Sequence, residues 1–454
     1  MKSVVLPLLI LTGAMVSARG QQFRTDINPA LLYYQAVIVA PDLSKADRDF
    51  LYNTNDWRGQ KLPERFGELV AQYANQFRLV RQAAHATVPC DWGIDRSAGP
   101  ATLLPQLARN KSVAQAARLR AMWDLQQGRP AEACDDLLAA FALASNTSRD
   151  GTAISVLVQF AIENIVLFTV AENFHRFSPE TLRQLVDGFE AAPARGTMAA
   201  CIPSEKSVFH DWMLRKILEL QKDNPGNDAK VMAGIHELFA GFEGADERQT
   251  NQAQPNLWEQ VTQAVGGTSK GVIKLMSERE RAYQRLALLM ALPHGEYEDQ
   301  MKRFSAEMQK PSSPFVSQTF PAWEKSRQKE FATLVALAMV RAAVEYKLHG
   351  EPGLKSVTDP CGRGPFAFQR FVFEGVDRGF QLKSAYDGLG YPEVVIFVEK
   401  EGPPIFCDRE ECGQGSLKSS HGRDDATALW SPSQIGKRLG GAFRVGLLGS
   451  FGYI

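Results

Sequence analysis

The residues best suited to chemistry in this chain are two cysteines near its C-terminal end, Cys407 and Cys412, spaced as CDREEC. We predict that they form a local disulfide, which would stabilise the fold by roughly 2 kcal/mol, mainly by restricting the unfolded chain. Metal binding by the pair is the less favoured alternative. No second cysteine pair or well-spaced histidine completes a set of four ligands.

Two serine patterns are open to a catalytic interpretation. The stretch GQGSLKSSHGRDD has the residue types of a hydrolase triad: Ser416, Ser419, Ser420, His421, Asp424 and Asp425. Neighbouring positions on one loop seldom reach triad geometry, so we interpret this stretch as a mobile polar loop. Ser326 and Lys329 fit the pattern SxxK within a charged helical stretch, where a solvated helix face is the favoured interpretation.

No other motif assigns a catalytic, cofactor-binding or metal-binding residue. The chain has no HExxH, P-loop or paired CxxC. Six further histidines show no ligand spacing and are interpreted as surface or packing residues: His85, His175, His210, His236, His294 and His349. The sequence therefore favours a role without catalysis and predicts no cofactor, while leaving an enzyme open.

Composition and charge exclude some classes of partner. The 454 residues include 51 Lys plus Arg and 51 Asp plus Glu, and no basic stripe of the kind that binds nucleic acid is visible. The length suffices for two or three domains. We expect a protein or peptide partner, and the sequence leaves the oligomeric state open.

The N-terminus predicts export. Lys2 precedes an apolar run at residues 4–16, and Val16-Ser17-Ala18 is a plausible cleavage site. We expect a cleaved signal peptide over residues 1–20 and a periplasmic or extracellular protein without an integral membrane span; an uncleaved inner-membrane anchor is the alternative. Export would place the cysteines in an oxidising compartment. Cys134 is interpreted as a core residue, and the pairing of Cys90, Cys201 and Cys361 cannot be deduced.

A helical hairpin at residues 113–145 is the clearest structural element. Apolar residues recur every three or four positions on both sides of the turn Gln127-Gly128-Arg129-Pro130. Gly128 suits the left-handed end of one helix and Pro130 the first turn of the next. The small residues Ala133 and Ala140 would allow close helix packing, whereas Gln126 and Arg129 should tolerate alanine. The hairpin resembles a single tetratricopeptide repeat unit.

Further helices are predicted along most of the chain. Asn28-Pro29 opens a helix to residue 40, a long amphipathic helix covers 62–84, and an apolar core helix covers 152–176. Residues 311–317 are expected to be a connection. After Gly350, turn residues alternate with β-branched and aromatic runs, which predicts three or four short antiparallel strands.

Two resemblances accompany these patterns. The strings CDWGIDRSAGPATLLPQL, LARNKSVAQAARLRAMWDLQQGRPAEACDDLLAAFALA and ISVLVQFAIENI resemble an uncharacterised family of exported bacterial helical proteins, common in planctomycetes. The C-terminal part is similar to the helix and small sheet of type II secretion pseudopilins, through Asp359, Pro360, Ser384, Asp387 and Gly388. Ala385 replaces an expected glycine there. Asp377 and Asp387 supply too few oxygen ligands for calcium, so the carboxylates are interpreted as solvated turn residues.

The sequence thus predicts a mainly α fold of stacked helical hairpins with a small α+β C-terminal module. The expected divisions are a signal peptide at 1–20, a helical-hairpin domain at 21–242, a second helical segment at 243–350, and a β-containing module with a polar loop at 351–454. The favoured function is a protein- or peptide-binding scaffold in the cell envelope. The alternatives are a hydrolase with a site assembled from distant residues, and a structural component of a secretion or envelope assembly.

Overall fold

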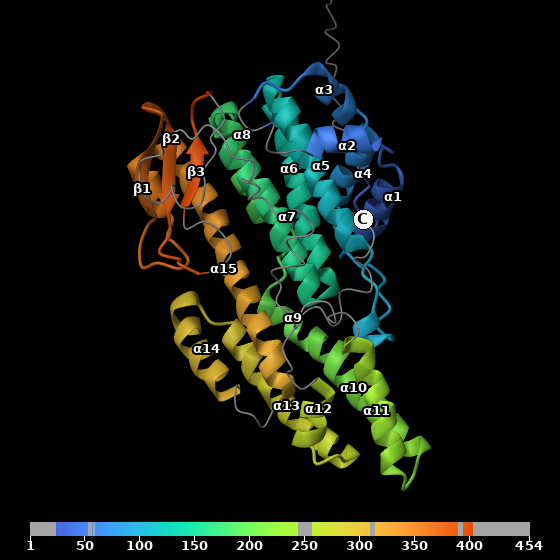
Figure 1. Cartoon of the computed structure of the whole chain (residues 1–454). Helices are drawn as coiled ribbons and strands as arrows, with labels where there is room; N and C mark the ends of the chain where they lie inside the picture. Colours follow the sequence, from blue (N-terminus) through green and yellow to red (C-terminus); the bar gives the residue numbers. More distant parts are fainter. Residues whose placement is uncertain are drawn as a thin grey trace, which may run out of the picture.

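The computed structural model describes residues 24–52, 57, 60–243, 257–308, 314–388 and 394–402. Most of these residues are helical, and a small antiparallel sheet lies near the end of the described chain (Figure 1). The protein is therefore mainly α with a small α+β module, as predicted. Cys407, Cys412 and the polar loop that follows them lie outside the described residues.

The first half of the fold is a stack of helices. They are α1 (Pro29–Ile38), α2 (Lys45–Tyr52), α3 (Glu64–Ala71), α4 (Ala74–Ala84), α5 (Gln106–Gln126), α6 (Pro130–Thr147), α7 (Ala153–Glu172) and α8 (Pro179–Ala191), with short 3₁₀ turns η1 (Gly99–Ala101), η2 (Ser148–Asp150) and η3 (Phe174–Arg176). Helix α6 packs against α4 and α8, while α7 packs against α5 and α15 (Pro314–His349). Helices α5 and α6 therefore form a hairpin, α7 packs on both of its helices, and α8 packs on α6 and α15 (Figure 1).

The central hairpin forms as its turn residues predict. Gly128 has a φ of 71°, in the left-handed region that favours glycine, and Pro130 is the first residue of α6. Ala133 and Ala140 are fully buried. Their small side chains let α6 pack closely against its neighbouring helices.

One expectation about this hairpin is wrong. The side-chain amide of Gln126 donates to the carbonyl oxygen of Leu62 (2.9 Å) and accepts from the amide of Leu62 (2.6 Å). Gln126 therefore ties the end of α5 to the chain that leads into α3. Replacement of Gln126 by alanine would leave both backbone groups of Leu62 without this partner, so tolerance is no longer expected.

The predicted long helix at residues 62–84 is two helices. Helix α3 ends at Ala71 and α4 begins at Ala74. The amides of Gln72 and Tyr73 bond to carbonyls three residues back, which tightens and ends α3. Tyr73 is buried at this break, and its hydroxyl bonds to the hydroxyl of Tyr52 (3.1 Å). The amphipathic pattern continues across the break, which is why the sequence concealed it.

The loop before α5 is anchored by Trp92. Its indole N–H donates to the carbonyl oxygen of Asn146 (2.8 Å), and its ring stacks on Tyr33 with 5.8 Å between centroids. At the start of the same region, Asn28 caps α1 by accepting from the amide of Ala30 (3.0 Å). These contacts join the first helix, the loop and α6 in one core.

The second half of the helical part has its own small core. Its elements are α9 (Met198–Glu205), a π-helical turn η4 (Lys206–Asp211), α10 (Trp212–Asp223), α11 (Asp228–Glu243), α12 (Leu257–Ala264), α13 (Ser269–Met290) and α14 (His294–Met308). Buried residues of α10 to α13 form a cluster separate from the main core. Figure 1 shows α10 to α14 below helices α1 to α8, with α9 and α15 connecting the two groups of helices.

Helix α15 leads to the sheet. It begins at Pro314, so the connection expected at residues 311–317 belongs in part to a helix. After α16 (Glu351–Ser356), strands β1 (Ala367–Phe373), β2 (Val376–Lys383) and β3 (Val394–Val398) pair antiparallel in the order β1-β2-β3. The rings of Phe380 and Phe397 meet Phe174 edge-on, at 5.9 and 5.4 Å between centroids. The sheet therefore packs against the C-terminal end of α7.

Candidate functional site

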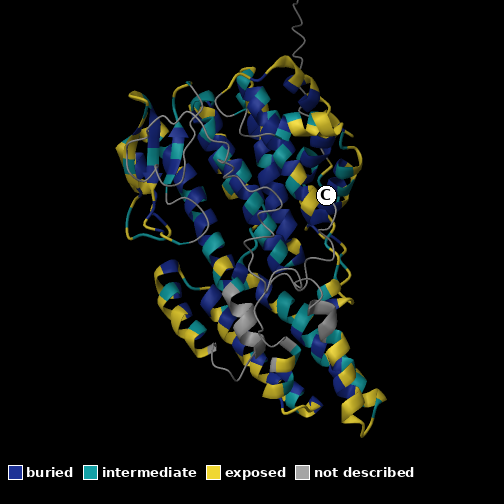
Figure 2. Cartoon of the chain, in the orientation of Figure 1, coloured by how far each residue is buried: buried dark blue, intermediate teal, exposed yellow. Residues whose placement is uncertain are grey.

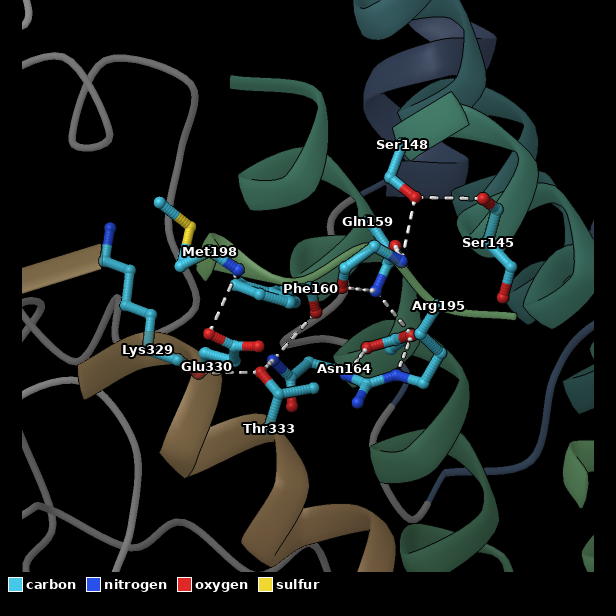
Figure 3. Close-up of polar contacts among 12 residues, drawn as sticks. Ser145, Ser148, Gln159, Phe160, Asn164, Arg195, Met198, Lys329, Glu330 and Thr333 are labelled. Atoms are coloured by element: carbon cyan, nitrogen blue, oxygen red, sulfur yellow. Dashed lines mark hydrogen bonds and ion pairs between the residues drawn. The ribbon is translucent and has the colours of Figure 1, made fainter. Parts of the chain in front are cut away.

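A buried polar junction joins α7, the link between α8 and α9, and α15 (Figure 3). At its centre the guanidinium of Arg195 donates to both carboxylate oxygens of Glu163, at 2.7 and 2.6 Å. The Glu163 side chain is 1% exposed and that of Arg195 18%. Burial raises the pKa of Glu163, and the charge of Arg195 opposes that rise. The pairing keeps a charged carboxylate tolerable inside the core.

The same junction fixes the backbone at Gly196. Its amide donates to Oε1 of Gln159 (2.8 Å) and to Oγ of Ser148 (3.1 Å). The amide group of Gln159 donates in turn to Glu163 (3.1 Å). A Cβ atom at Gly196 would lie 2.6 Å from Ser148, so the close approach requires glycine. These bonds hold the link in one position against η2 and α7.

Helix α15 enters the junction through Thr333 and Glu330 (Figure 3). Asn164 donates to Oγ1 of Thr333 (3.1 Å), and Glu330 accepts from the amide of Met198 (3.2 Å), the first residue of α9. Glu330 also pairs with Arg327. A carboxylate at a helix N-terminus is favourable, and each acid here has a cationic partner. The junction is therefore a structural lock between the two halves of the chain.

The expectation of a solvated face at Ser326 and Lys329 is wrong. Both lie on α15, where Ser326 is 2% exposed and Lys329 is half-buried. The hydroxyl of Ser326 donates to the carbonyl oxygen of Ala322 (2.7 Å). In the described part of the chain no hydrogen bond joins Ser326 to Lys329. The pair does not form a nucleophile and base, because the serine proton is directed to the helix backbone.

A second buried cluster surrounds Asp150. Its carboxylate accepts from the amide (2.9 Å) and hydroxyl (3.0 Å) of Thr152 and from the hydroxyl of Ser155. Nearby, Glu205 accepts from the amide of Ala153 (2.6 Å), which is the first residue of α7. Burial raises the pKa of both Asp150 and Glu205. The two carboxylates cap the start of α7.

The described cysteines offer no reactive thiol. Cys90, Cys134 and Cys201 are buried, Cys361 is half-buried, and all four are free. Cys134 is a core residue, as predicted. Burial raises the pKa of each of these thiols, so they stay protonated and weakly nucleophilic.

The histidines mostly serve packing. His210 is fully buried in the π-helical turn, where its Nδ1 has no hydrogen-bonding partner in the described structure and its ring meets Tyr283 edge-on. Burial and the charge of Arg279 lower the pKa of His210, so it is neutral. Single π-helical turns often mark functional sites. Here the π-helical turn directs the imidazole ring of His210 into the core.

The pseudopilin-like turn is also structural. Asp359 is buried, and its carboxylate accepts from the hydroxyl of Ser384 (2.8 Å) and the amide of Ala385 (2.8 Å). Asp359 is therefore not a solvated turn residue. Asp377 pairs with Arg370 (2.7 Å), and Asp387 is exposed. Within the described ranges, no group of three or more His, Cys, Asp or Glu side chains has a geometry that could hold a metal ion.

Helix α7 carries a face of half-buried apolar side chains. Its residues Ile154, Val158, Ala161 and Ile165 share one face, and we call these four the α7 stripe. All four are half-buried, and Val158 and Ile165 pack in part against Ala114 of α5 and Ala144 of α6. Helix α7 as a whole packs on α5, α6 and α15, and Figure 2 shows the helices of this region coloured mainly as buried or intermediate. Among described residues, α7 is the single helix long and apolar enough to cross a membrane, and 67% of its apolar window is buried.

Two lysines flank the α7 stripe. Lys111 lies on α5 one turn before Ala114, which packs with Ile162 of α7. Lys329 lies on α15 one turn before Thr333, which bonds to Asn164 of α7. Ile162 and Asn164 are two residues apart and point in nearly opposite directions from the helix axis. The two lysines therefore lie on helices that contact α7 on opposite sides of the stripe.

These flanking groups lack polar partners. Burial lowers the pKa of Lys111 and, with the charge of Lys325, the pKa of Lys329. Neither ammonium group has an ion pair or hydrogen bond to a described residue. One turn along α5 from Lys111, the buried Oε1 atom of Gln115 also has no described partner. A bound segment could satisfy these groups: its carboxylates would pair with the two ammonium groups, and a backbone amide would donate to Oε1 of Gln115.

The comparisons with known proteins add no relative. No protein-family model, no curated protein and no solved structure matches this chain. The candidate site therefore rests on the geometry of α5, α7 and α15.

Proposed function

We propose that this chain is an exported scaffold that binds a protein or peptide segment along the α7 stripe. The observation that carries the proposal is the combination at α7: four half-buried apolar side chains bordered by Lys111 and Lys329, whose ammonium groups have no described carboxylate partner. An apolar segment with an acidic group would cover the four apolar side chains and neutralise the ammonium groups of the lysines.

The dimensions of the stripe favour a short segment. Ile154 to Ile165 spans about 16 Å along the helix axis, at ~1.5 Å per residue. That length corresponds to about five residues of extended chain or three turns of helix. Both are common forms for peptides bound in apolar grooves.

Export is a second element of the proposal. It is supported by Lys2, the apolar run at residues 4–16 and the small residues after it, and by the resemblance to exported bacterial helical proteins. The packed helices α5, α6, α7 and α8 suit a binding role, because helical arrays present continuous surfaces to partners.

The hydrolase alternative has less support. Glu163 and Glu330 each pair with a guanidinium group, and the hydroxyl of Ser326 donates to a backbone carbonyl. These groups are committed to structural bonds. The envelope-assembly alternative depends on the pseudopilin-like end, where Asp359 is likewise committed to its own turn.

Selection of peptides from a random phage-displayed library on the full-length chain tests the proposal. We expect apolar sequences with at least one acidic residue, whose affinity falls about tenfold or more with Val158→Glu, since that change places a carboxylate on the stripe. Leu31→Glu on α1, also an apolar-to-acidic change, is the matched control and should leave binding intact. Failure to enrich peptides, or equal losses in both variants, would refute binding at the stripe.

A further inference from the structure

The chain itself contains a candidate occupant for the α7 stripe. Residues 439–454, LGGAFRVGLLGSFGYI, have one charged side chain, Arg444. A segment of this composition is unfavourable in water unless its apolar side chains are covered. We infer that residues 439–454 dock along the α7 stripe and occupy the proposed peptide site. The inference rests on the proposed function only in holding that the same site also accepts other segments.

The described chain ends close to the stripe. Strand β3 packs against α7, and Glu401, just after it, accepts from the guanidinium of Arg176 (2.9 Å) beyond the end of α7. Residues 403–438 connect this point to the apolar segment. A chain of that length can extend to on the order of 100 Å, whereas α7 is about 30 Å long. The segment can therefore reach every part of the stripe.

The charges of the intervening residues fit the flanks of the stripe. Residues 403–438 carry five carboxylates, Asp408, Glu410, Glu411, Asp424 and Asp425. Any of them can neutralise Lys111 or Lys329 once the apolar segment is docked. The same stretch carries five Lys and Arg residues, so charge alone does not select it. The selection comes from the apolar residues 439–454, which match the stripe.

Site-specific photo-crosslinking on the full-length chain tests this placement. A benzophenone amino acid is placed at Val158, and in a second variant at Lys111, so that one misfolded variant does not end the test. We expect adducts to map to residues 439–454 from both positions. The same probe at Ile38 of α1, which is 80% exposed, should give none. Absence of adducts from both positions, or adducts to other segments, would overturn the inference.

Isotope mixing separates one chain from two. Labelled and unlabelled chains are mixed before photolysis, and each adduct is examined by mass spectrometry. Docking within one chain predicts adducts whose two peptides carry the same isotope. Adducts that mix isotopes would assign the stripe to a second copy of the chain and overturn the intramolecular placement.

A tail variant distinguishes this inference from the proposed function. Phe443→Asp with Leu447→Asp should abolish the adducts and raise the affinity for library-selected peptides by about tenfold if the segment occupies nine sites in ten. Ser419→Asp with Ser420→Asp adds the same charges in the polar stretch and should change neither readout. Tail adducts without peptide binding by the tail variant would refute the proposed function alone. Peptide binding without tail adducts would refute the docking alone.

Discussion

Removal of Arg195 should be among the most damaging single substitutions in this protein. Arg195→Met keeps a side chain of similar length but leaves the carboxylate of Glu163 buried without its guanidinium. The two charged bonds of 2.7 and 2.6 Å would be lost, and the amide of Gln159 would remain as the donor to Glu163. Because Glu163 is 1% exposed, water cannot replace the missing partner.

The magnitude follows from this burial. Breaking a buried ion pair by removing one partner costs about 3–5 kcal/mol. Glu163→Leu combined with Arg195→Met removes both charges, and such replacements are often neutral or stabilising. We therefore expect the double variant to recover most of the stability lost in Arg195→Met. The pair Glu190–Arg341 is the control: its side chains are 57% and 54% exposed, so Arg341→Met should cost under about 1 kcal/mol.

Urea unfolding followed by circular dichroism measures these effects, with the slope checked for each variant. We expect Arg195→Met to be the least stable protein. The double variant should be more stable than Arg195→Met, up to or beyond the stability of the parent, because both charges are removed. If Arg195→Met unfolds with the parent, or if the double variant loses the sum of the single losses, the junction is not the lock described above.

Two further predictions concern the hairpin and the start of α7. Ala133→Leu should overpack the fully buried face of α6 at about 1–3 kcal/mol, and Gly128→Val should also destabilise because φ is 71° there; thermal melts that match the parent would count against the packing. Burial raises the pKa of Glu205 above its ordinary 4.5, so the folded state binds the carboxyl proton more tightly than the unfolded state does. Stability is therefore lost as pH rises from about 4.5 through the raised pKa. Glu205→Gln should therefore gain stability over the parent at pH 7.5 and little at pH 4.5 in urea unfolding, and an equal change at both pH values would contradict the assignment.

Local signals explain the parts of the fold that the sequence predicted. Asn28 before Pro29, and Gly128 with Pro130, set helix ends through backbone geometry that depends on near neighbours. The sequence did not show the break at Tyr73, because the amphipathic pattern continues across it. The hydrogen bond between Tyr73 and Tyr52, twenty-one residues away, is a tertiary contact that helix periodicity does not report.

The site was harder to predict than the fold. Helix α7 is apolar on nearly all sides, so its sequence cannot reveal which face is left half-buried. The burial of Ser326 and Lys329 was not predicted for a related reason: several helices that pack on α15, among them α7, α8 and α12, are distant in sequence. Glu163 and Asn164 were visible as polar residues in an apolar helix, and that interruption was a usable signal for the buried junction.

Methyl NMR of the full-length chain during titration with the tightest library-selected peptide tests binding at the α7 stripe most directly. The methyl groups of Ile154, Val158 and Ile165 report on the stripe, and those of Val372 and Val376, exposed on the β1–β2 hairpin, report on an unrelated apolar surface. We expect saturable shifts at the three stripe residues and none at the two hairpin valines. Shifts confined to Val372 and Val376, or none at the stripe while the peptide binds, would contradict the account.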